Sequence, residues 1–130
     1  MELVVTLGEK AKVNAEFKGH TICTDQPMPS GDNSAPTPFD LFLASLGTCA
    51  GIFVKGFCQQ RGIPDEGIKI IQTFDFDREK HLVRNITIEI KLPAGFPEKY
   101  KDAIVNVADL CLVKRHLADP PVIETFATIG

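Results

Sequence analysis

The chain has 130 residues, of which 44% are hydrophobic and 24% charged, and this balance excludes a disordered chain. Its net charge of −3 gives no electrostatic basis for binding nucleic acid or an anionic membrane. The length predicts one domain, spanning residues 1–130. The N-terminus lacks the charged, apolar and small-residue regions of a signal peptide, so we expect a cytoplasmic protein.

Apolar runs separated by turn residues predict three strands in the first part of the chain. These strands cover residues 2–7, 12–17 and 20–25. In the second of them, Val13, Ala15 and Phe17 fall on one face, which we expect to lie against a core. Residues 26–38 are rich in Pro, Gly, Ser, Asp and Asn, and this composition predicts a loop.

A long helix is predicted next, ending near residue 61. Thr37 suits the cap position, Pro38 suits the first turn, and Asp40 lies where the helix dipole favours an acid. Residues 41–54 contain no charge. This uncharged run is too short to span a bilayer, so we expect a buried core helix and no membrane partner.

The second half of the chain predicts a hairpin, a second helix and a last strand. The hairpin strands are residues 69–77 and 82–92, and the later one alternates apolar and polar residues. The helix opens at Pro97 and runs to about Leu117, and the last strand covers residues 122–128. The order strands, helix, strands, helix, strand predicts an α+β fold with antiparallel sheets and two main helices.

Four cysteines, at positions 23, 49, 58 and 111, are too few and too dispersed for a secreted disulfide scaffold. The three histidines lie in different segments and there is no CxxC motif, so we expect no metal and no cofactor. Cys49 and Cys58 face opposite sides of the predicted helix, roughly 13 Å apart along its axis. They cannot form a disulfide with each other.

Cys111 lies on the apolar stripe of the second helix, with Lys114 and Arg115 one turn later. Nearby cations favour a reactive thiolate, but helix ends often carry cations anyway, so both a reactive and a structural Cys111 stay open. Cys49 alone fits a core residue. Packed helices roughly 8–10 Å apart can bring two such thiols to disulfide distance. One thiolate could then attack an oxidant while the second resolves the sulfenic acid.

Two stretches together resemble a known family. APTPFDLFLASLGTCAGIFVKGFCQQRGI, within residues 31–63, resembles the proline-led central helix of the OsmC/Ohr family, and DLCLVKRHLADPPVIETF resembles its second-cysteine helix and final strand. The resemblance implies an intertwined homodimer with active sites at the interface. It also implies a cysteine-based peroxidase that reduces organic hydroperoxides, with Cys49 peroxidatic and Cys111 resolving, and a dithiol as reductant.

The family pairs its reactive cysteine with an arginine from the N-terminal strands and a glutamate directly after the helix-opening proline. In this chain no arginine precedes position 61, and a phenylalanine follows Pro38. Lys10 or Lys12 is therefore the candidate activating cation, as a point charge in place of a guanidinium fork. Asp40 is the candidate acid.

A binding module is the second hypothesis. An apolar cleft at the dimer interface, lined by Phe39, Phe42 and Phe53, would hold a hydrophobic small molecule in a non-catalytic or redox-sensing protein. The absent arginine and glutamate favour this hypothesis. Two cysteines on separate helices favour the peroxidase.

Overall fold

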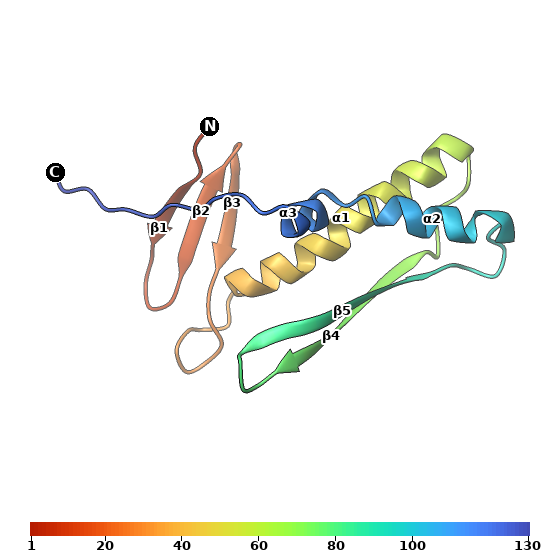
Figure 1. Cartoon of the computed structure of the whole chain (residues 1–130). Coiled ribbons are helices and arrows are strands. Elements are labelled where there is room, and N and C mark those ends of the chain that lie inside the picture. Colours follow the sequence, from red (N-terminus) through yellow and green to blue (C-terminus); the bar gives the residue numbers. More distant parts are fainter. The chain divides into compact units, whose positions relative to one another are not determined.

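The computed structural model describes residues 1–130, and its contacts divide the chain into two compact units, residues 1–44 and 45–130. Figure 1 shows the helices and strands in chain order. The boundary between the units falls inside the long helix α1 (Pro38–Arg61), so each unit contains part of that helix. The assignment of the whole chain to one domain stays a prediction.

The first unit contains a three-stranded antiparallel sheet. Its strands, in the order in which they pair, are β1 (Val4–Leu7), β2 (Val13–Phe17) and β3 (His20–Thr24). Val13 lies opposite both Leu7 and Thr24, and this pairing sets the register. The three predicted strands are confirmed, each within its predicted bounds.

Helix α1 begins with a reciprocal cap. The Asp40 N–H donates to the Thr37 hydroxyl oxygen at 3.1 Å, and the Thr37 N–H donates to the Asp40 carboxylate at 3.0 Å. This arrangement satisfies two amides that the first turn leaves without helical acceptors. Pro38 has no N–H and loses nothing in that turn. The predicted helix start is confirmed.

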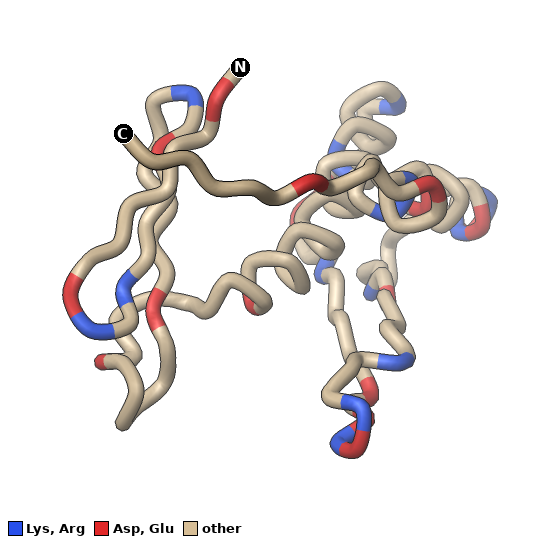
Figure 2. The backbone as a smooth tube through the Cα atoms, turned by 60° about the vertical axis from the view of Figure 1, so that its left-hand side comes forward, with Lys and Arg blue, Asp and Glu red and all other residues tan.

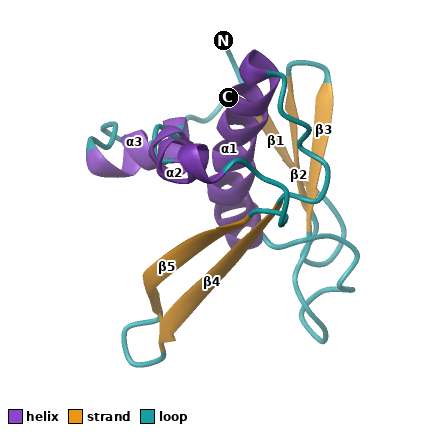
Figure 3. Cartoon of the chain, turned by 90° about the vertical axis from the view of Figure 1, so that its right-hand side faces the viewer, coloured by secondary structure: helices purple, strands orange, loops and turns teal.

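The second unit places a hairpin against α1 (Figure 3). Its strands β4 (Lys69–Asp77) and β5 (Leu82–Lys91) are antiparallel, as predicted. A Cβ added to Gly47 would lie 2.7 Å from the Gln72 side-chain oxygen, and one added to Gly51 would lie 3.4 Å from Ile70. The two glycines of α1 therefore allow the hairpin to approach the helix closely.

The core of the second unit gathers around the later part of α1. Its members come from α1 and from α2 (Lys101–Ala108): Ala50, Val54, Phe57, Cys58, Ile104 and Ala108. Ile104 and Cys58 have no exposed surface. Burying a side chain such as Ile104 contributes roughly 1.5–3 kcal/mol, so this cluster fixes α2 on α1.

Charge is distributed unevenly along the second unit. The sequence of α1 has no charged residue between Asp40 and Lys55, whereas Figure 2 shows charged residues crowding the turn of the β4–β5 hairpin. By length and composition alone α1 could cross a membrane, a test that the core helix of a soluble protein also passes. Of its 18-residue apolar window, 28% is buried.

The predicted second helix, from Pro97 to about Leu117, is wrong as one continuous element. It is divided into a 3₁₀ turn η1 (Glu98–Tyr100), α2, and α3 (Leu112–Ala118). Cys111 has φ −47° and ψ 126°, so the backbone leaves the helical region there. Figures 1 and 3 show α2 and α3 running in different directions as a result.

The predicted last strand, residues 122–128, is also wrong for the single chain. Residues 119–130 contain no strand, and Figure 1 draws them as an extended tail. A strand requires hydrogen bonds from a neighbouring strand, and no strand of this chain pairs with the segment. Its large apolar side chains stay exposed: Val122, Ile123, Phe126 and Ile129.

Candidate active site

The two predicted thiols, Cys49 and Cys111, meet in the second unit. Cys49 lies on α1, where it is half-buried, and Cys111 lies at the start of α3 with only 2% of its surface exposed. Both are free thiols, and each affects the pKa of the other. The arrangement therefore holds two reduced sulfur atoms side by side.

Cys111 is held by two hydrogen bonds. Its thiol donates to the carbonyl oxygen of Leu46 at 3.9 Å, which connects it to α1. Its sulfur accepts from the N–H of Lys114 at 3.5 Å, which makes Cys111 the N-cap residue of α3. Sulfur is a weak donor and a weak acceptor, so each bond contributes modestly, but together they fix the side chain between the two helices.

The surroundings of Cys49 favour its charged form. The N–H of Val113 donates to its sulfur and is the main cause of a lowered pKa, while burial acts in the opposite direction. The Cys111 thiol and the N–H of Leu112 lower the pKa further. Donors that stabilise a thiolate make a cysteine a better nucleophile at neutral pH.

The surroundings of Cys111 have the opposite effect. Burial raises the pKa of its thiol, the neighbouring Cys49 adds to the rise, and the Lys114 N–H opposes it. The side chain of Lys114 pairs with Asp109 at 3.0 Å. The sequence left open whether Lys114 and Arg115 activate Cys111. The structure does not favour this activation. The surroundings therefore favour ionisation of Cys49 over ionisation of Cys111.

The other two cysteines lie outside this pair. Cys58 is fully buried in the core, and burial is the main cause of its raised pKa. Cys23 is exposed on β3 in the first unit. No group of three or more His, Cys, Asp or Glu side chains lies together in a way that could hold a metal ion.

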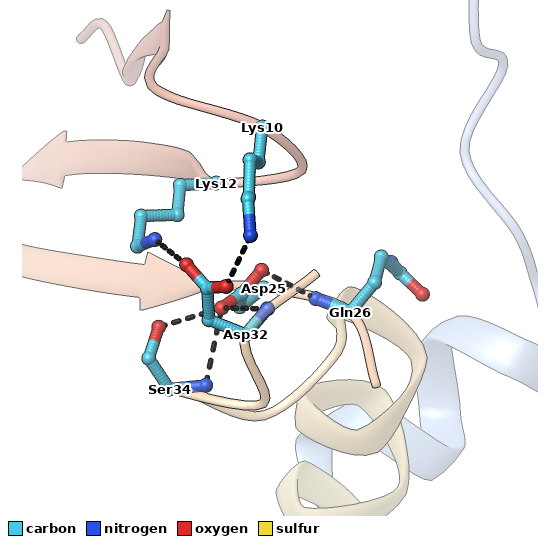
Figure 4. A network of polar contacts seen from close by, with 6 residues as sticks. All are labelled: Lys10, Lys12, Asp25, Gln26, Asp32 and Ser34. Atoms are coloured by element: carbon cyan, nitrogen blue, oxygen red, sulfur yellow. Dashed lines mark hydrogen bonds and ion pairs between the residues drawn. The ribbon is translucent and has the colours of Figure 1, made fainter. Parts of the chain in front are cut away.

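The candidate cations Lys10 and Lys12 lie together in the first unit and share one carboxylate (Figure 4). The Nζ atoms of both lysines are 2.7 Å from oxygens of Asp32. The two ammonium groups lower the pKa of Asp32, with Lys10 the larger cause, and Asp32 raises the pKa of Lys12. The pairing leaves one unit of positive charge in excess over this trio.

The loop that carries Asp32 is organised by the buried carboxylate of Asp25 (Figure 4). It accepts bonds from the hydroxyl of Ser34 at 2.6 Å, from the Ser34 N–H at 3.1 Å and from the Gln26 N–H at 2.8 Å. The Asp32 N–H adds a fourth bond at 3.2 Å. These donors, led by the Ser34 hydroxyl, hold the pKa of Asp25 far below its usual range. A Cβ on Gly31 would come too close to the same carboxylate, so only glycine fits there.

The remaining predicted site residues lie on α1. The Asp40 carboxylate is engaged by the Thr37 N–H in the helix cap. The rings of Phe39 and Phe42 stack with centroids 5.6 Å apart, and Phe39 is about half exposed. Phe53 is half-buried in the second unit. The structure thus brings Phe39 and Phe42 together.

A cavity of about 410 Å³ adjoins the Cys111 side of the pair. Its walls include Leu46 and Lys114, the two residues that hydrogen-bond the Cys111 sulfur. The remaining walls come from β5 and from the segment around α3: Ile86, Thr87, Ile88, Asp109 and Leu117. Neither Cys49 nor Cys111 lines this cavity itself.

Sequence reasoning missed the backbone donors of the site. The N–H groups of Leu112 and Val113 reach Cys49 because the chain leaves its helical path at Cys111. Cysteine is not a common N-cap residue, so no sequence signal indicates this break. The carbonyl of Leu46 could not be identified either, since every residue carries one.

A family profile described as OsmC-like protein matches residues 31–126. Among solved structures, a Psychrobacter arcticus 273-4 protein described in terms of osmotic stress and detoxification response has a TM-score of 0.74 at 22% identity. The match covers 87% of this chain and 85% of that chain. The OsmC like protein of Mycoplasma pneumoniae has a TM-score of 0.71 at 16% identity, covering 92% of this chain and 87% of that chain.

A third solved structure is the organic hydroperoxide resistance protein OhrB of Bacillus subtilis. Its TM-score is 0.56 at 14% identity, with 92% of this chain and 90% of that chain covered. No protein with curated annotation shows significant sequence similarity to this chain. The solved structures establish a shared α+β fold with antiparallel sheets, and the predicted fold class is confirmed.

Proposed function

The chain belongs to the OsmC-like protein family, and from this membership we propose that it is a thiol-dependent peroxidase that reduces organic hydroperoxides. The description of its Bacillus subtilis relative as a hydroperoxide resistance protein supports this substrate class. The observation that carries the proposal is the hydrogen bond from the Cys111 thiol to the carbonyl oxygen of Leu46, which places Cys111 against α1 one turn from Cys49. It pairs a nucleophile with a second thiol that can resolve the product.

In the first step the Cys49 thiolate attacks an oxygen of the hydroperoxide. An S–O bond forms while the O–O bond breaks, and the departing alkoxide takes up a proton to become an alcohol. Cys49 is oxidised by two electrons to a sulfenic acid, and the hydroperoxide is reduced by two. The N–H groups of Val113 and Leu112 support this step, because they stabilise the thiolate that attacks.

In the second step Cys111 attacks the sulfenic sulfur of Cys49. An S–S bond forms, the S–O bond breaks, and the thiol proton leaves with the hydroxide as water. A dithiol reductant then exchanges with this disulfide and is itself oxidised to a disulfide, which restores both cysteines. The position of Cys111 beside Cys49 supports resolution within the chain.

A homodimer is the second part of the proposal. Apolar side chains exposed on the single chain supply the support: Leu3, Val4, Val5, Leu7, Ile52, Val122, Ile123 and Phe126. A monomer rarely leaves so many large apolar groups in water, and a second copy can cover them. It can also supply the neighbouring strand that residues 122–128 lack. A folded monomer at micromolar concentration in sedimentation velocity would refute the dimer.

Mass spectrometry during titration with an organic hydroperoxide tests the peroxidase. One equivalent should convert the reduced protein to a species lighter by two hydrogens, with a Cys49–Cys111 linkage in the peptide map. A dithiol should restore the original mass, and alcohol should form in equal amount. If both cysteines stay reduced, the peroxidase proposal is refuted and the result favours the alternative, a non-catalytic binding protein.

A further inference from the structure

Cys111 has a structural position that the resolving role does not require. We propose that Cys111 also acts before any oxidation, as a positioning residue: by capping α3 it holds the N–H groups of Leu112 and Val113 against the Cys49 sulfur. The proposal rests on the proposed function only for the assignment of Cys49 as the attacking thiol. It predicts that the resolving cysteine affects the first chemical step.

The cap itself is well defined. The backbone at Cys111 is extended, and the side chain accepts from the N–H three residues later, on Lys114. This is the hydrogen bond that N-cap residues make. The thiol hydrogen points to the Leu46 carbonyl, which lies one turn before Cys49 on α1. One side chain therefore connects the start of α3 to the segment of α1 that carries the nucleophile.

Helix α3 has few other means of staying in place. It is seven residues long and contributes no buried side chain. Leu112 and Leu117 are each about half exposed, and the Lys114 side chain pairs with Asp109 near the surface. Cys111 is the one nearly buried residue at this end of the helix, so we expect the direction of the first amides to depend on it.

Two substitutions at position 111 separate the capping role of the side chain from its role in disulfide formation. Cys111→Ser keeps a side chain that caps and donates, and serine is a better N-cap than cysteine, but it forms no disulfide. Cys111→Ala removes the cap, the bond to Leu46 and the direct contact with Cys49 together. A merely structural loss would destabilise the chain without moving the pH dependence of a thiol elsewhere.

The first measurement is the rate at which Cys49 is alkylated by iodoacetamide as a function of pH. Peptide mass spectrometry quantifies Cys49 separately from Cys23 and Cys58. At pH 7 we expect Cys111→Ala to slow Cys49 alkylation by about threefold or more, the change that half a pKa unit produces. The profile should return to that of the unaltered protein in Cys111→Ser. No hydroperoxide is used, so the result does not depend on peroxidase activity.

The second measurement distinguishes the cap from the direct thiol contact. Hydrogen exchange of residues 112–118 is compared in Cys49→Ser, Cys49→Ser/Cys111→Ala and Cys49→Ser/Cys111→Ser, where Cys49 itself is absent. We expect protection of these amides to fall with alanine at position 111 and to be retained with serine. A slower alkylation with unchanged α3 protection would overturn the proposal, because the direct contact would then explain it. An unchanged alkylation profile, or a serine variant that behaves like the alanine variant, would overturn it as well.

Discussion

The Cys111 thiol donates a hydrogen bond to the Leu46 carbonyl oxygen across 65 positions of sequence, at 3.9 Å. Burial raises the pKa of the Cys111 thiol, and the neighbouring Cys49 adds to the rise. Backbone donors meanwhile favour the thiolate of Cys49. The surroundings of the two thiols therefore favour ionisation of Cys49 over Cys111, which predicts an order of attack.

We expect Cys49 to be oxidised first. In Cys111→Ser, one equivalent of organic hydroperoxide should leave Cys49 as a sulfenic acid that dimedone traps, because no thiol is present to resolve it. In Cys49→Ser, Cys111 should stay reduced under the same conditions, since its burial disfavours the thiolate. Labelling of Cys111 in the second variant, with none on Cys49 in the first, would exchange the two roles.

The pH dependence of alkylation should separate the cysteines of the second unit. The pKa of Cys49 is lowered and that of Cys58 is raised, so at any pH near neutrality Cys49 has the larger thiolate fraction. Iodoacetamide should modify Cys49 at lower pH than Cys58 in the folded protein. In 8 M urea the two profiles should coincide, because the shifts come from the fold. A difference that persists in urea would contradict this explanation.

Two glycines of α1 should respond differently to alanine. A Cβ at Gly56 meets nothing within 4 Å, so Gly56→Ala should stabilise the protein by about 0.5–1 kcal/mol through helix propensity. A Cβ at Gly47 would lie 2.7 Å from the Gln72 oxygen, so Gly47→Ala forces that side chain to shift and should destabilise by about 1 kcal/mol. Urea unfolding of the two variants measures both changes. Equal effects would show that β4 does not press on Gly47.

The buried carboxylate of Asp25 should make the first unit sensitive to acid. Its pKa is lowered in the folded state, so its contribution to stability is present above the ordinary value of 3.8 and is lost as the pH falls toward the folded value. Asp25→Asn should lower the urea midpoint at pH 7, and the deficit should shrink below pH 3.8. Ser34→Ala, which removes one of four donors, should have a smaller effect. A deficit that is independent of pH would assign the role of Asp25 to shape instead of charge.

If Lys10 or Lys12 stabilises the Cys49 thiolate, charge changes around Asp32 should appear in the alkylation profile. Lys10→Gln or Lys12→Gln should raise the Cys49 pKa, whereas Asp32→Asn should lower it, because it leaves both ammonium groups uncompensated. All shifts should weaken in 1 M salt. Identical profiles in the three variants would remove both lysines from the candidate site.

Most of the fold could be predicted from the sequence. Local signals suffice where an element carries its own pattern, as in the Thr37–Asp40 cap of α1 and the alternation in β5. The division between α2 and α3 could not be predicted, because no Gly or Pro marks a boundary at Cys111 while the break coincides with a sulfur acceptor. The last strand failed for a different reason, since an apolar pattern does not show whether a neighbouring strand is available, and no strand of this chain pairs with the segment.

The side chains of the candidate site could be predicted from the sequence, but its backbone N–H donors could not. The family resemblance indicated Cys49 and Cys111, which the structure brings together. Charge spacing left activation of Cys111 by Lys114 as one of two open alternatives; in the structure the Lys114 side chain pairs with Asp109, and its N–H donates to the sulfur. Every residue except proline carries a backbone N–H, so the sequence does not show which one will act as a donor. Donors such as the Val113 N–H are identified only once the tertiary structure is known.

The cap made by Cys111 has a consequence for how this chain can diverge. Substitution at position 111 is subject to two pressures, one from redox chemistry and one from the start of α3, and serine satisfies only the second. A lineage that abandons the disulfide is therefore expected to drift toward Ser, Thr, Asp or Asn at this position, and away from Ala or Val. Its descendants would keep the boundary between α2 and α3 although they no longer form the disulfide.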